Sequence, residues 1–580
     1  MPALIGKKLS TYNALTFSAV FGNIGENLYL YVGKPLAWDD ETSPATPEDT
    51  PEYHNSIWNG MAGMVRVNSS DVSPAIKRNN WTSNTVYSRY HHANTNLGDD
   101  YYVLAGSTDR DVYKCLDNNG YNVSTSKPIH KNLGITRESD GYAWKYMYTI
   151  RETDFIKFAT ANVIPVSVNE DVSRISRLGS VIHLPIDASK TDGIGKYYRG
   201  TGYVNTSYST LASNATIYTT VNANTTTREI KVIADSGLAP YNDYYTNSAF
   251  IVTSGIGAGT YRIITDHKVD SDGTRGSDGA TITHANLVFN APVSELANGD
   301  TFIIGPRITD PNNDLNGAGF LAVGITNDTG NITSIEVSMV GRGYSNGVSS
   351  NVYINGVYDP TTATAAVHPN GTHANVEFIL APSGGGHGYN PFFELNAKYV
   401  VVAPQTLVAR DHQTGIFAGY GNEYRQVGIV RNPIEADNGR FASRDSYDLR
   451  ATLYFAQSTT LNFLQDQRVY NSITAGDETA SGLVYSICGT TPNRYISLVD
   501  VQGQFANGDV IYNRLGDTAT IHSTSLSNFE YPLYSQNQPK SSVMSSSIAK
   551  YVGEIVYHEN ILPITRMKDQ KEQFKFVFEF

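Results

Sequence analysis

Apolar and polar residues alternate over short stretches of this chain, a pattern typical of β-strands with one buried face. The clearest example follows the turn dipeptide Asp140-Gly141, where aromatic residues occupy every second position: Tyr142, Trp144, Tyr146 and Tyr148. Successive side chains of a strand point to opposite faces, so this spacing predicts a strand with four aromatic rings on one face. Aromatic side chains bury large areas, and we therefore expect this row to be buried in a core or in a subunit interface.

A second row with the same alternation ends the chain. It consists of four phenylalanines: Phe574, Phe576, Phe578 and Phe580. The pattern predicts a half-buried strand and not a frayed tail. We expect this strand to pair with the alternating stretch Leu449–Phe455. Both aromatic rows are candidates for structural or interface residues.

Helical patterns are few and short. The best candidate is Arg151–Phe158, because Thr153 can cap it, and Ser73–Arg78 fits one helical turn with Pro near its start. Residues 16–37 are expected to hold the first pair of strands. No helical pattern longer than about twelve residues stands out, which excludes doubly wound α/β folds. The expected fold class is mostly β: a multidomain, β-sandwich-like architecture with few short helices.

The chain has 580 residues, which is more than one hydrophobic core supports, so several domains are expected. The pattern of apolar and turn-forming residues also changes along the chain. From residue 186 to residue 372, short apolar runs alternate with Gly, Asn, Asp and Ser, as in β-sandwiches. An Asn-Gly turn that feeds a strand occurs both at 298–304 and at 507–512. The predicted division is an N-terminal core at 1–185, inserted β-modules at 186–372, continued core at 373–465, a second small insertion at 466–530 and C-terminal core strands at 531–580.

Composition narrows the range of functions. Charged residues make up only 17% of the chain, whereas 50 Gly and 39 Tyr favour turns and strands. The net charge of −12 argues against a nucleic-acid-binding surface, because such surfaces neutralise phosphates with Lys and Arg. No apolar run approaches the length of a membrane span, and the first residues lack the pattern of a signal peptide. A soluble protein that binds neither nucleic acid nor membrane is therefore expected.

Two motifs resemble ligand-binding loops but are better explained as turns. Gly255–Gly259 resembles part of a phosphate-binding loop, but the residues after it predict a strand and not the required helix. Asp270–Gly273 resembles a calcium loop, but its Gly comes too early and no acidic residue closes the loop. We expect a hairpin at each position. Cys115 and Cys488 are expected to be reduced, buried thiols, and one long-range disulfide is the alternative.

Other titratable residues form no recognisable catalytic or metal set. His91-His92 would point to opposite faces of a strand, and the Gly-rich turn around His387 would let two backbones approach each other. The acid pairs Asp99-Asp100 and Asp111 with Asp117 could flank a sugar if the fold brought them to the right separation. We expect no catalysis, no cofactor and no metal.

A series of short motifs resembles a known family. Val112–Gly120, Lys127-Pro128 and the aromatic row after Asp140 resemble the baseplate wedge subunit called gene product eight of T-even-type contractile-tailed phages. Further blocks follow in the family's order: Trp81–Tyr87, Asn162–Val166, Gly384–Gly388 with Glu394-Leu395, Glu423–Ile429, Gly553–Tyr557 and Leu562–Arg566. Residues 186–372 and 470–530 have no counterpart in the family's short form and resemble insertions.

The resemblance implies a structural protein of the virion, assembled in the host cytoplasm and located in the tail baseplate. It implies a homodimer within each wedge, beside the counterparts of gene products six, seven and ten. Such a subunit links inner and peripheral baseplate proteins and moves with them when the sheath contracts. The alternative is a tail fibre or spike-like protein that binds a receptor or glycan. A dimer favours the wedge, and a trimer favours the spike.

Overall fold

The computed structural model describes residues 6–168, 229–309, 318–342, 379–404, 423–523 and 541–580 with short gaps, and isolated short segments at 204–218, 354–366 and 407–408. Strands account for 41% of the residues and helices for 10%, which confirms the mostly β, multidomain expectation. The chain forms two compact units. Unit 1 comprises Met1–Ala75 and Lys398–Phe580, and unit 2 comprises Ile76–Ala397. The chain passes between the units after Ala75 and after Ala397, and the residue pattern of the sequence does not change at either point.

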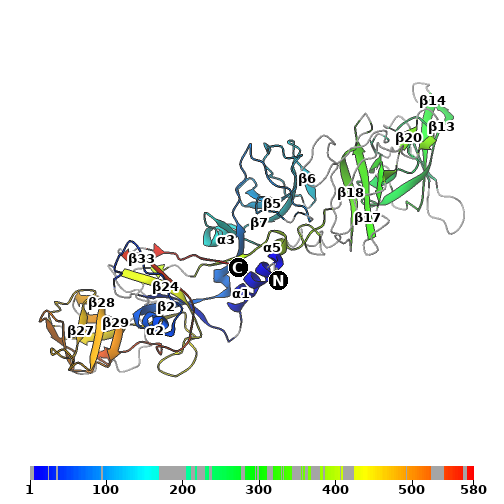
Figure 1. Ribbon diagram of the computed structural model, residues 1–580. Coiled ribbons are helices and arrows are strands. Elements are labelled where there is room, and N and C mark those ends of the chain that lie inside the picture. Colours follow the sequence, from blue (N-terminus) through cyan, green and yellow to red (C-terminus); the bar gives the residue numbers. More distant parts are fainter. Residues whose placement is uncertain are drawn as a thin grey trace, which may run out of the picture. The chain divides into compact units, whose positions relative to one another are not determined.

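A five-stranded antiparallel sheet in unit 1 combines both ends of the chain (Figure 1). Its strands, in spatial order, are β25 (Ser446–Asp448), β2 (Met61–Val67), β1 (Leu28–Gly33), β24 (Glu423–Arg431) and β33 (Glu554–Thr565). The central strand β1 is buried at every position, because Leu28 and Leu30 pack into one cluster and Tyr29 and Tyr31 into another. The sheet therefore has a core on each face.

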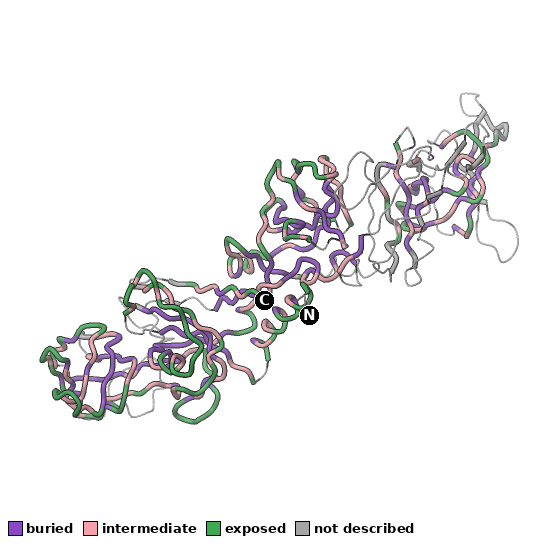
Figure 2. Tube along the Cα trace, in the orientation of Figure 1, coloured by how far each residue is buried: buried purple, intermediate pink, exposed green. Residues whose placement is uncertain are grey.

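A seven-stranded sheet forms the other β-structure of unit 1. Its strands, in spatial order, are β31 (Thr518–Thr520), β30 (Val510–Tyr512), β27 (Arg468–Tyr470), β28 (Ala480–Thr490), β29 (Asn493–Gly503), β26 (Ala451–Phe455) and β32 (Val543–Met544). The predicted turn at 507–512 is present, since Gly508 has φ of +89° and β30 follows it. Buried residues run through the strands while the connecting loops are exposed (Figure 2).

The C-terminal strand β35 (Phe576–Glu579) is half-buried as predicted, but its expected partner was wrong. It pairs with β22 (Tyr399–Val402), which also pairs with β3 (Val72–Lys77), and not with Leu449–Phe455. Strand β26, in that stretch, already has β29 on one side and β32 on the other, which leaves no edge for β35.

The helices correct three sequence-based expectations. Helix α1 (Lys7–Val20) has 14 residues, so it exceeds the expected helix length and replaces the first strand predicted within residues 16–37. Its Phe17 ring contacts Phe578 and Phe580 at 5.2 and 5.3 Å, which is tertiary cover that the local pattern does not contain. Ser73–Arg78 is not a helical turn, because β3 occupies it and pairs with β22.

The remaining helices are short. Helix α2 (Pro51–Gly60) begins after Thr50, whose hydroxyl accepts a hydrogen bond from the backbone N–H of Tyr53. Helix α3 (Glu152–Phe158) confirms the predicted helix, although no side chain caps it. Helix α5 (Pro391–Glu394) is a single turn, and η1 (Ser69–Asp71) is a 3₁₀ turn.

Unit 2 contains a four-stranded antiparallel sheet formed by residues 102–149. Its strands, in spatial order, are β4 (Tyr102–Ala105), β5 (Asp111–Asp117), β7 (Ala143–Thr149) and β6 (Ile135–Arg137). Strand β8 (Val163–Pro165) follows later in the chain and belongs to another sheet. Every residue of β5 is buried, and β7 is buried along all but its last residue. Both faces of this sheet are therefore covered.

The strands between residues 207 and 366 form further sheets of unit 2. The seven-stranded sheet has the spatial order β10 (Thr216–Tyr218), β11 (Glu229–Ile233), β14 (Thr281–Phe289), β13 (Tyr261–Arg275), β12 (Ala249–Val252), β15 (Thr301–Gly305) and β9 (Ser207–Thr210). The four-stranded sheet has the order β18 (Ile332–Arg342), β17 (Ala318–Thr326), β16 (Arg307–Thr309) and β19 (Ile354–Asn355). Two smaller ladders pair β20 (Val357–Asp359) with β21 (Thr364–Ala366) and, in unit 1, β23 (Leu407–Val408) with β34 (Lys571–Glu572).

One of the two predicted hairpin turns is correct. Gly255–Gly259 connects the paired strands β12 and β13, and Gly255 has φ of +79°. Asp270–Gly273 instead lies within β13, where Asp270 is opposite His284 in β14. The expected turn at Asp270 was wrong because the strand continues through these polar residues, and the connection to β14 lies outside the described residues.

Candidate functional site

The aromatic row of β7 is buried, as predicted, but it does not share one face. Tyr142, Trp144 and Tyr148 have no exposed surface, and Tyr146 is 3% exposed. The ladder between β5 and β7 shifts register, because Val112 is opposite Tyr148 whereas Tyr113 is opposite Tyr146. The extra residue in β7 is a bulge, which turns the side chains beyond it to the other face.

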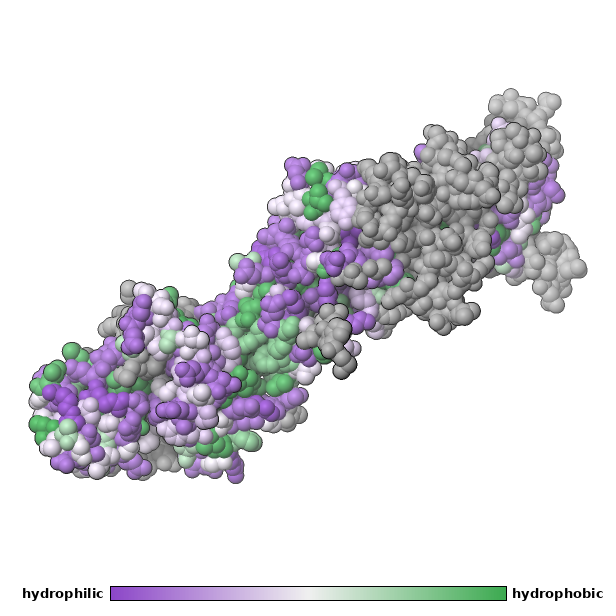
Figure 3. All heavy atoms as spheres, viewed as in Figure 1, coloured by the Kyte–Doolittle hydropathy of each residue, from purple (hydrophilic) through white to green (hydrophobic). Residues whose placement is uncertain are grey.

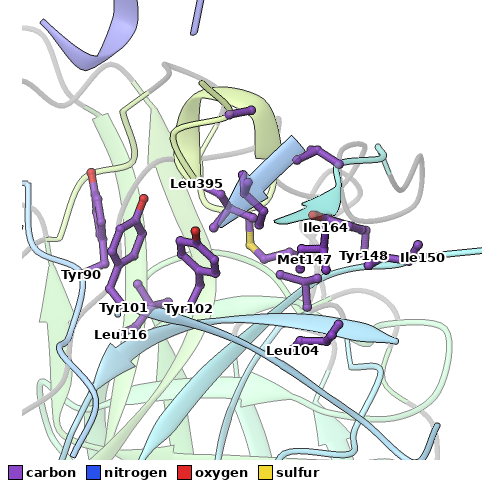
Figure 4. Close-up of a cluster of buried hydrophobic side chains, with 14 of the residues drawn as sticks. Tyr90, Tyr101, Tyr102, Leu104, Leu116, Met147, Tyr148, Ile150, Ile164 and Leu395 are labelled. Carbon is purple, nitrogen blue, oxygen red and sulfur yellow. The ribbon is translucent and has the colours of Figure 1, made fainter. Parts of the chain in front are cut away.

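The bulge divides the row between two hydrophobic clusters. Tyr142, Trp144 and Tyr146 pack with Tyr87, and the Tyr142 and Trp144 rings stack with centroids 5.5 Å apart. Tyr148 packs in the opposite cluster, shown in Figure 4 with these labelled residues: Tyr90, Tyr101, Tyr102, Leu104, Leu116, Met147, Ile150, Ile164 and Leu395. The row therefore contributes to two cores of unit 2.

The turn before the row fixes where it begins. Gly141 has φ of +84°, and a Cβ atom there would lie 2.6 Å from the Asn119 amide nitrogen, so only Gly fits. The Asp140 carboxylate accepts hydrogen bonds from the backbone N–H groups of Thr125 and Ser126 at 2.8 and 2.9 Å. This turn therefore anchors the preceding loop as well as the strand.

A buried ionic cluster lies beside these cores, and sequence reasoning missed it. The Lys114 Nζ atom lies 2.8 Å from Glu394 Oε2 and 2.9 Å from His387 Nδ1. The side chains of Lys114 and Glu394 are completely buried. We call Lys114, His387 and Glu394 the ionic cluster.

Local structure positions each member of the ionic cluster. Lys114 projects from β5, and Glu394 ends α5, whose first turn is capped by the Asn390 side chain. The other Glu394 oxygen accepts hydrogen bonds from the backbone N–H groups of Gly388 and Asn390 at 2.7 and 3.2 Å. Every oxygen of this carboxylate thus has a donor, which is what burial of a charge requires.

The imidazole of His387 makes two contacts that the sequence did not predict. Its Nε2 atom lies 2.7 Å from the backbone carbonyl of Ile379, so Nε2–H donates there and Nδ1 accepts from the Lys114 ammonium. Burial and the neighbouring Lys114 charge hold the pKa of His387 well below its usual value, so the imidazole is neutral. A Lys in the middle of an apolar strand was the signal that could have revealed this cluster.

Two lysines experience the same low-polarity environment. Burial lowers the pKa of Lys114, and the Glu394 carboxylate opposes this shift. Lys145 is opposite Lys114 in the β5–β7 ladder and is 4% exposed. Burial lowers the pKa of Lys145 to about 8, with Glu394 raising it and Lys114 lowering it. The Tyr90 ring lies over the Lys114 ammonium at 3.9 Å and adds a cation–π contact.

The ionic cluster can hold chain segments together but cannot meet a substrate. Its charged atoms have no exposed surface, and its polar atoms are satisfied by one another and by nearby backbone groups. It joins β5 to residues 379–394, which are far from β5 in the sequence. Its effect is therefore structural.

The other titratable candidates also serve structural contacts. His91 and His92 do not lie in a strand, which corrects the expected geometry: their rings stack 4.6 Å apart, and His92 Nδ1 accepts the Leu380 N–H at 3.2 Å. Asp100 accepts the Ser88 hydroxyl at 2.7 Å, and the Asp99 backbone carbonyl accepts the Asn79 amide. Within the described part of the chain, no group of three or more His, Cys, Asp or Glu residues could hold a metal ion.

The predicted acid pair in β5 does not converge. Asp111 and Asp117 are the two ends of this strand, so they are about 20 Å apart at 3.3 Å per residue. The carboxylates of a glycosidase lie within about 10 Å of each other. Asp111 pairs with Lys131 at 3.3 Å and Asp117 with Arg137 at 2.8 Å.

One predicted thiol is described. Cys115 is free and buried, as expected, and burial raises the pKa of its thiol. The expectation for Cys488 lies outside the described side chains.

An open groove of about 810 Å³ in unit 1 was not predicted from the sequence. Its lining residues come from the loop before α2, from α2 and from the start of β33: Asp49, Pro51, His54, Asn55, Trp58, Tyr551 and residues 553–558. His54 Nε2 lies 3.3 Å from Asp49 Oδ1, and the rings of His54 and His558 are 5.5 Å apart. The lining has polar groups but no nucleophile paired with a base.

A scan against protein-family models and a search of curated proteins both find no match to this chain. Among the described residues, no helix combines the length and apolar character that crossing a membrane requires.

Proposed function

We propose that this chain is a structural component of the baseplate wedge of a contractile phage tail, without catalytic activity. The observation that carries the proposal is the position of the blocks that resemble the wedge family. Asp140–Ile150 contains β7, Glu423–Ile429 begins β24, and Glu394-Leu395 belongs to the ionic cluster and its adjoining core. These three blocks thus lie in the interior framework of the two units, as suits a protein whose task is to keep its shape.

The contacts of the titratable side chains support a structural role over an enzymatic one. Lys114, His387 and Glu394 are bonded to one another in the interior. The Asp111 and Asp117 carboxylates lie at opposite ends of one strand, and each is held by a basic residue. Such contacts stiffen a β-framework, and they leave these groups without the open geometry that catalysis needs.

The surface is compatible with assembly by extended contacts. Figure 3 shows hydrophilic residues over most of the visible described surface, with apolar residues in separate groups. Exposed apolar side chains occur on α1 and on β35, where Leu9, Tyr12 and Val577 are 50%, 58% and 43% exposed. In the proposed role, the chain is a homodimer in the virion, beside the counterparts of gene products six, seven and ten. It links inner and peripheral baseplate proteins and moves with them on sheath contraction.

The test is reconstitution. The full chain is purified alone and after co-expression with the counterparts of gene products six, seven and ten, and masses are measured under native conditions. We expect a dimer alone and a stable complex with at least one counterpart. A matched preparation in which Trp144→Ala disrupts unit 2 should lose the complex. A trimer that binds glycans would support the spike alternative instead, and turnover of a cell-wall polymer would overturn the structural assignment.

A further inference from the structure

The groove in unit 1 lies between one face of a helix and the outer edge of a sheet. On the helix side, its lining residues are Pro51, His54, Asn55 and Trp58, which follow the i, i+3, i+4, i+7 spacing of one face of α2. On the sheet side, the lining residues 553–558 are consecutive. Successive side chains of a strand alternate between faces, so a hollow that touches all of them opens onto the edge of β33.

This edge offers backbone hydrogen-bonding groups. Among the described strands, β33 forms a ladder with β24 alone and is the last strand of its sheet. An edge strand presents N–H and C=O groups on its free side, which is a template for a further strand. The loop before α2 already uses the far part of this edge, because Trp38 Nε1 donates to the Ile561 carbonyl at 3.2 Å. Next to the groove, the same loop meets the His558 ring through the Glu48 backbone, but among the described residues no backbone hydrogen bond from outside the ladder reaches Glu554–His558.

The groove is acidic. The Asp49 and Glu554 side chains are 94% and 66% exposed, and both line it. The lining contains no Lys or Arg, and in the loop before α2 the Glu41 carboxylate is already paired with Arg425 at 2.8 Å. The nearby Arg431 is shared between Glu26 and Glu554, so it does not neutralise the groove fully. Val556, 42% exposed, adds an apolar contact at the same edge.

We propose that the groove binds an extended segment of another protein that carries Lys or Arg, and that this segment adds to β33 as a sixth strand. Main-chain hydrogen bonds to Glu554–His558 would supply affinity, and the acidic lining would select basic side chains. A volume of about 810 Å³ suits a short peptide segment. The proposal rests on the groove alone and holds whether or not the chain acts in a baseplate.

A second copy of this chain is the less suitable occupant. The chain carries a net charge of −12, and a symmetric pairing of two β33 edges would bring two acidic grooves together. Like charges in apposition disfavour association. The negative charge of the groove instead favours association with a basic partner.

The test uses the full chain and a capped peptide that alternates Lys and Val, with binding followed by fluorescence anisotropy. The controls are the same peptide with Glu in place of Lys and the Lys peptide with alternate backbone amides N-methylated. We expect only the unmodified Lys peptide to bind. Its binding should slow amide hydrogen exchange in β33 at 554–558, as a new ladder requires.

Two variants with a matched control separate strand addition from general attraction to an acidic protein. Asp49→Lys should weaken binding about threefold to tenfold, whereas Asp39→Lys, the same charge change outside the groove lining, should leave it within about twofold. Val556 has no Cα partner at the register shift of the β24–β33 ladder, so Val556→Pro removes an N–H of this stretch at a position outside the regular register. This variant should also weaken binding.

Three results would overturn the proposal. One is equal binding of the Lys and Glu peptides, or of the methylated and unmethylated ones. Another is equal weakening by Asp39→Lys and Asp49→Lys. The third is a dimer of the chain alone in which exchange is slowed at 554–558, since a second copy would then occupy the groove.

Discussion

The rows of alternating aromatic residues in β7 and before the C-terminus have the same sequence pattern and different surroundings. In the first row, formed by Tyr142 and three residues of β7, all four rings are between 0% and 3% exposed. In the C-terminal row, Phe576 is 7% exposed, while Phe574, Phe578 and Phe580 are only partly buried. Strand β7 lies inside its sheet with a hydrophobic cluster on each face. Strand β35 lies at the edge of its sheet, with α1 against its phenylalanine face.

This comparison shows what an alternating pattern can and cannot specify. Alternation predicts a strand and a face that avoids water, and both rows obey it. The depth of burial depends on the layers that cover the strand, and these come from distant segments. Even the shared face of a row depends on its neighbour, since the bulge in β7 sends Tyr148 to the other side.

The sharpest test of the comparison is Trp144→Ala. Trp144 is completely buried between Tyr142 and Tyr87, so its removal leaves a large cavity and should cost about 3–5 kcal/mol. Denaturant-dependent hydrogen exchange of β5 and β7 measures the loss within unit 2. A cost below about 1 kcal/mol would contradict the dense packing of this row.

A second test addresses the ionic cluster behind the β7 row. Lys114→Met leaves the Glu394 charge buried without its cation, which should cost about 3–5 kcal/mol. The double variant with Glu394→Gln removes that charge but keeps an oxygen for the Gly388 and Asn390 N–H groups. It should recover a large part of the loss in the same exchange measurement. If the double variant is less stable than Lys114→Met, the carboxylate is not the destabilising group.

The C-terminal row should show a graded response. Phe576→Ala should cost about 3 kcal/mol, because this ring is almost fully buried in the core of unit 1. Phe580→Ala should cost about 1 kcal/mol, because its ring is only partly buried. Exchange of the β22 amides reports both changes. Equal costs at the two positions would remove the distinction between the buried and half-buried members of the row.

The last test concerns the pH dependence of stability in unit 2. The pKa of Lys145 is about 8 in the folded chain against 10.5 for an unperturbed lysine. Between these values the unfolded chain binds more protons, so this group makes stability rise with pH in that window. The contribution is at most about 1.4 kcal/mol per pH unit. Lys145→Met should flatten the stability curve between pH 8 and 9.5, below the range in which tyrosines such as Tyr142, whose pKa is raised, reverse the trend.

Local sequence was sufficient for several elements. The Asp140-Gly141 turn, the strands after it and at the C-terminus, helix α3 and the Gly255–Gly259 hairpin all follow from side-chain alternation or from residues that favour turns. These features depend on interactions within a few residues. The mostly β fold class follows from the same signals, because the chain is rich in Tyr, which favours strands, and in Gly, which favours turns.

Tertiary structure decided the rest. Helix α1 forms because its apolar face covers β35, whose sequence lies at the opposite end of the chain. His387 becomes a buried hydrogen-bond acceptor only because the fold brings it to Lys114 and Glu394. Asp111 and Asp117 stay apart because they are the two ends of one extended strand. The groove beside β33 likewise requires α2 and a strand that begins about five hundred residues later. Sequence alone determined which segments are strands and which positions avoid water, whereas the partners of each segment arose from contacts that no local pattern contains.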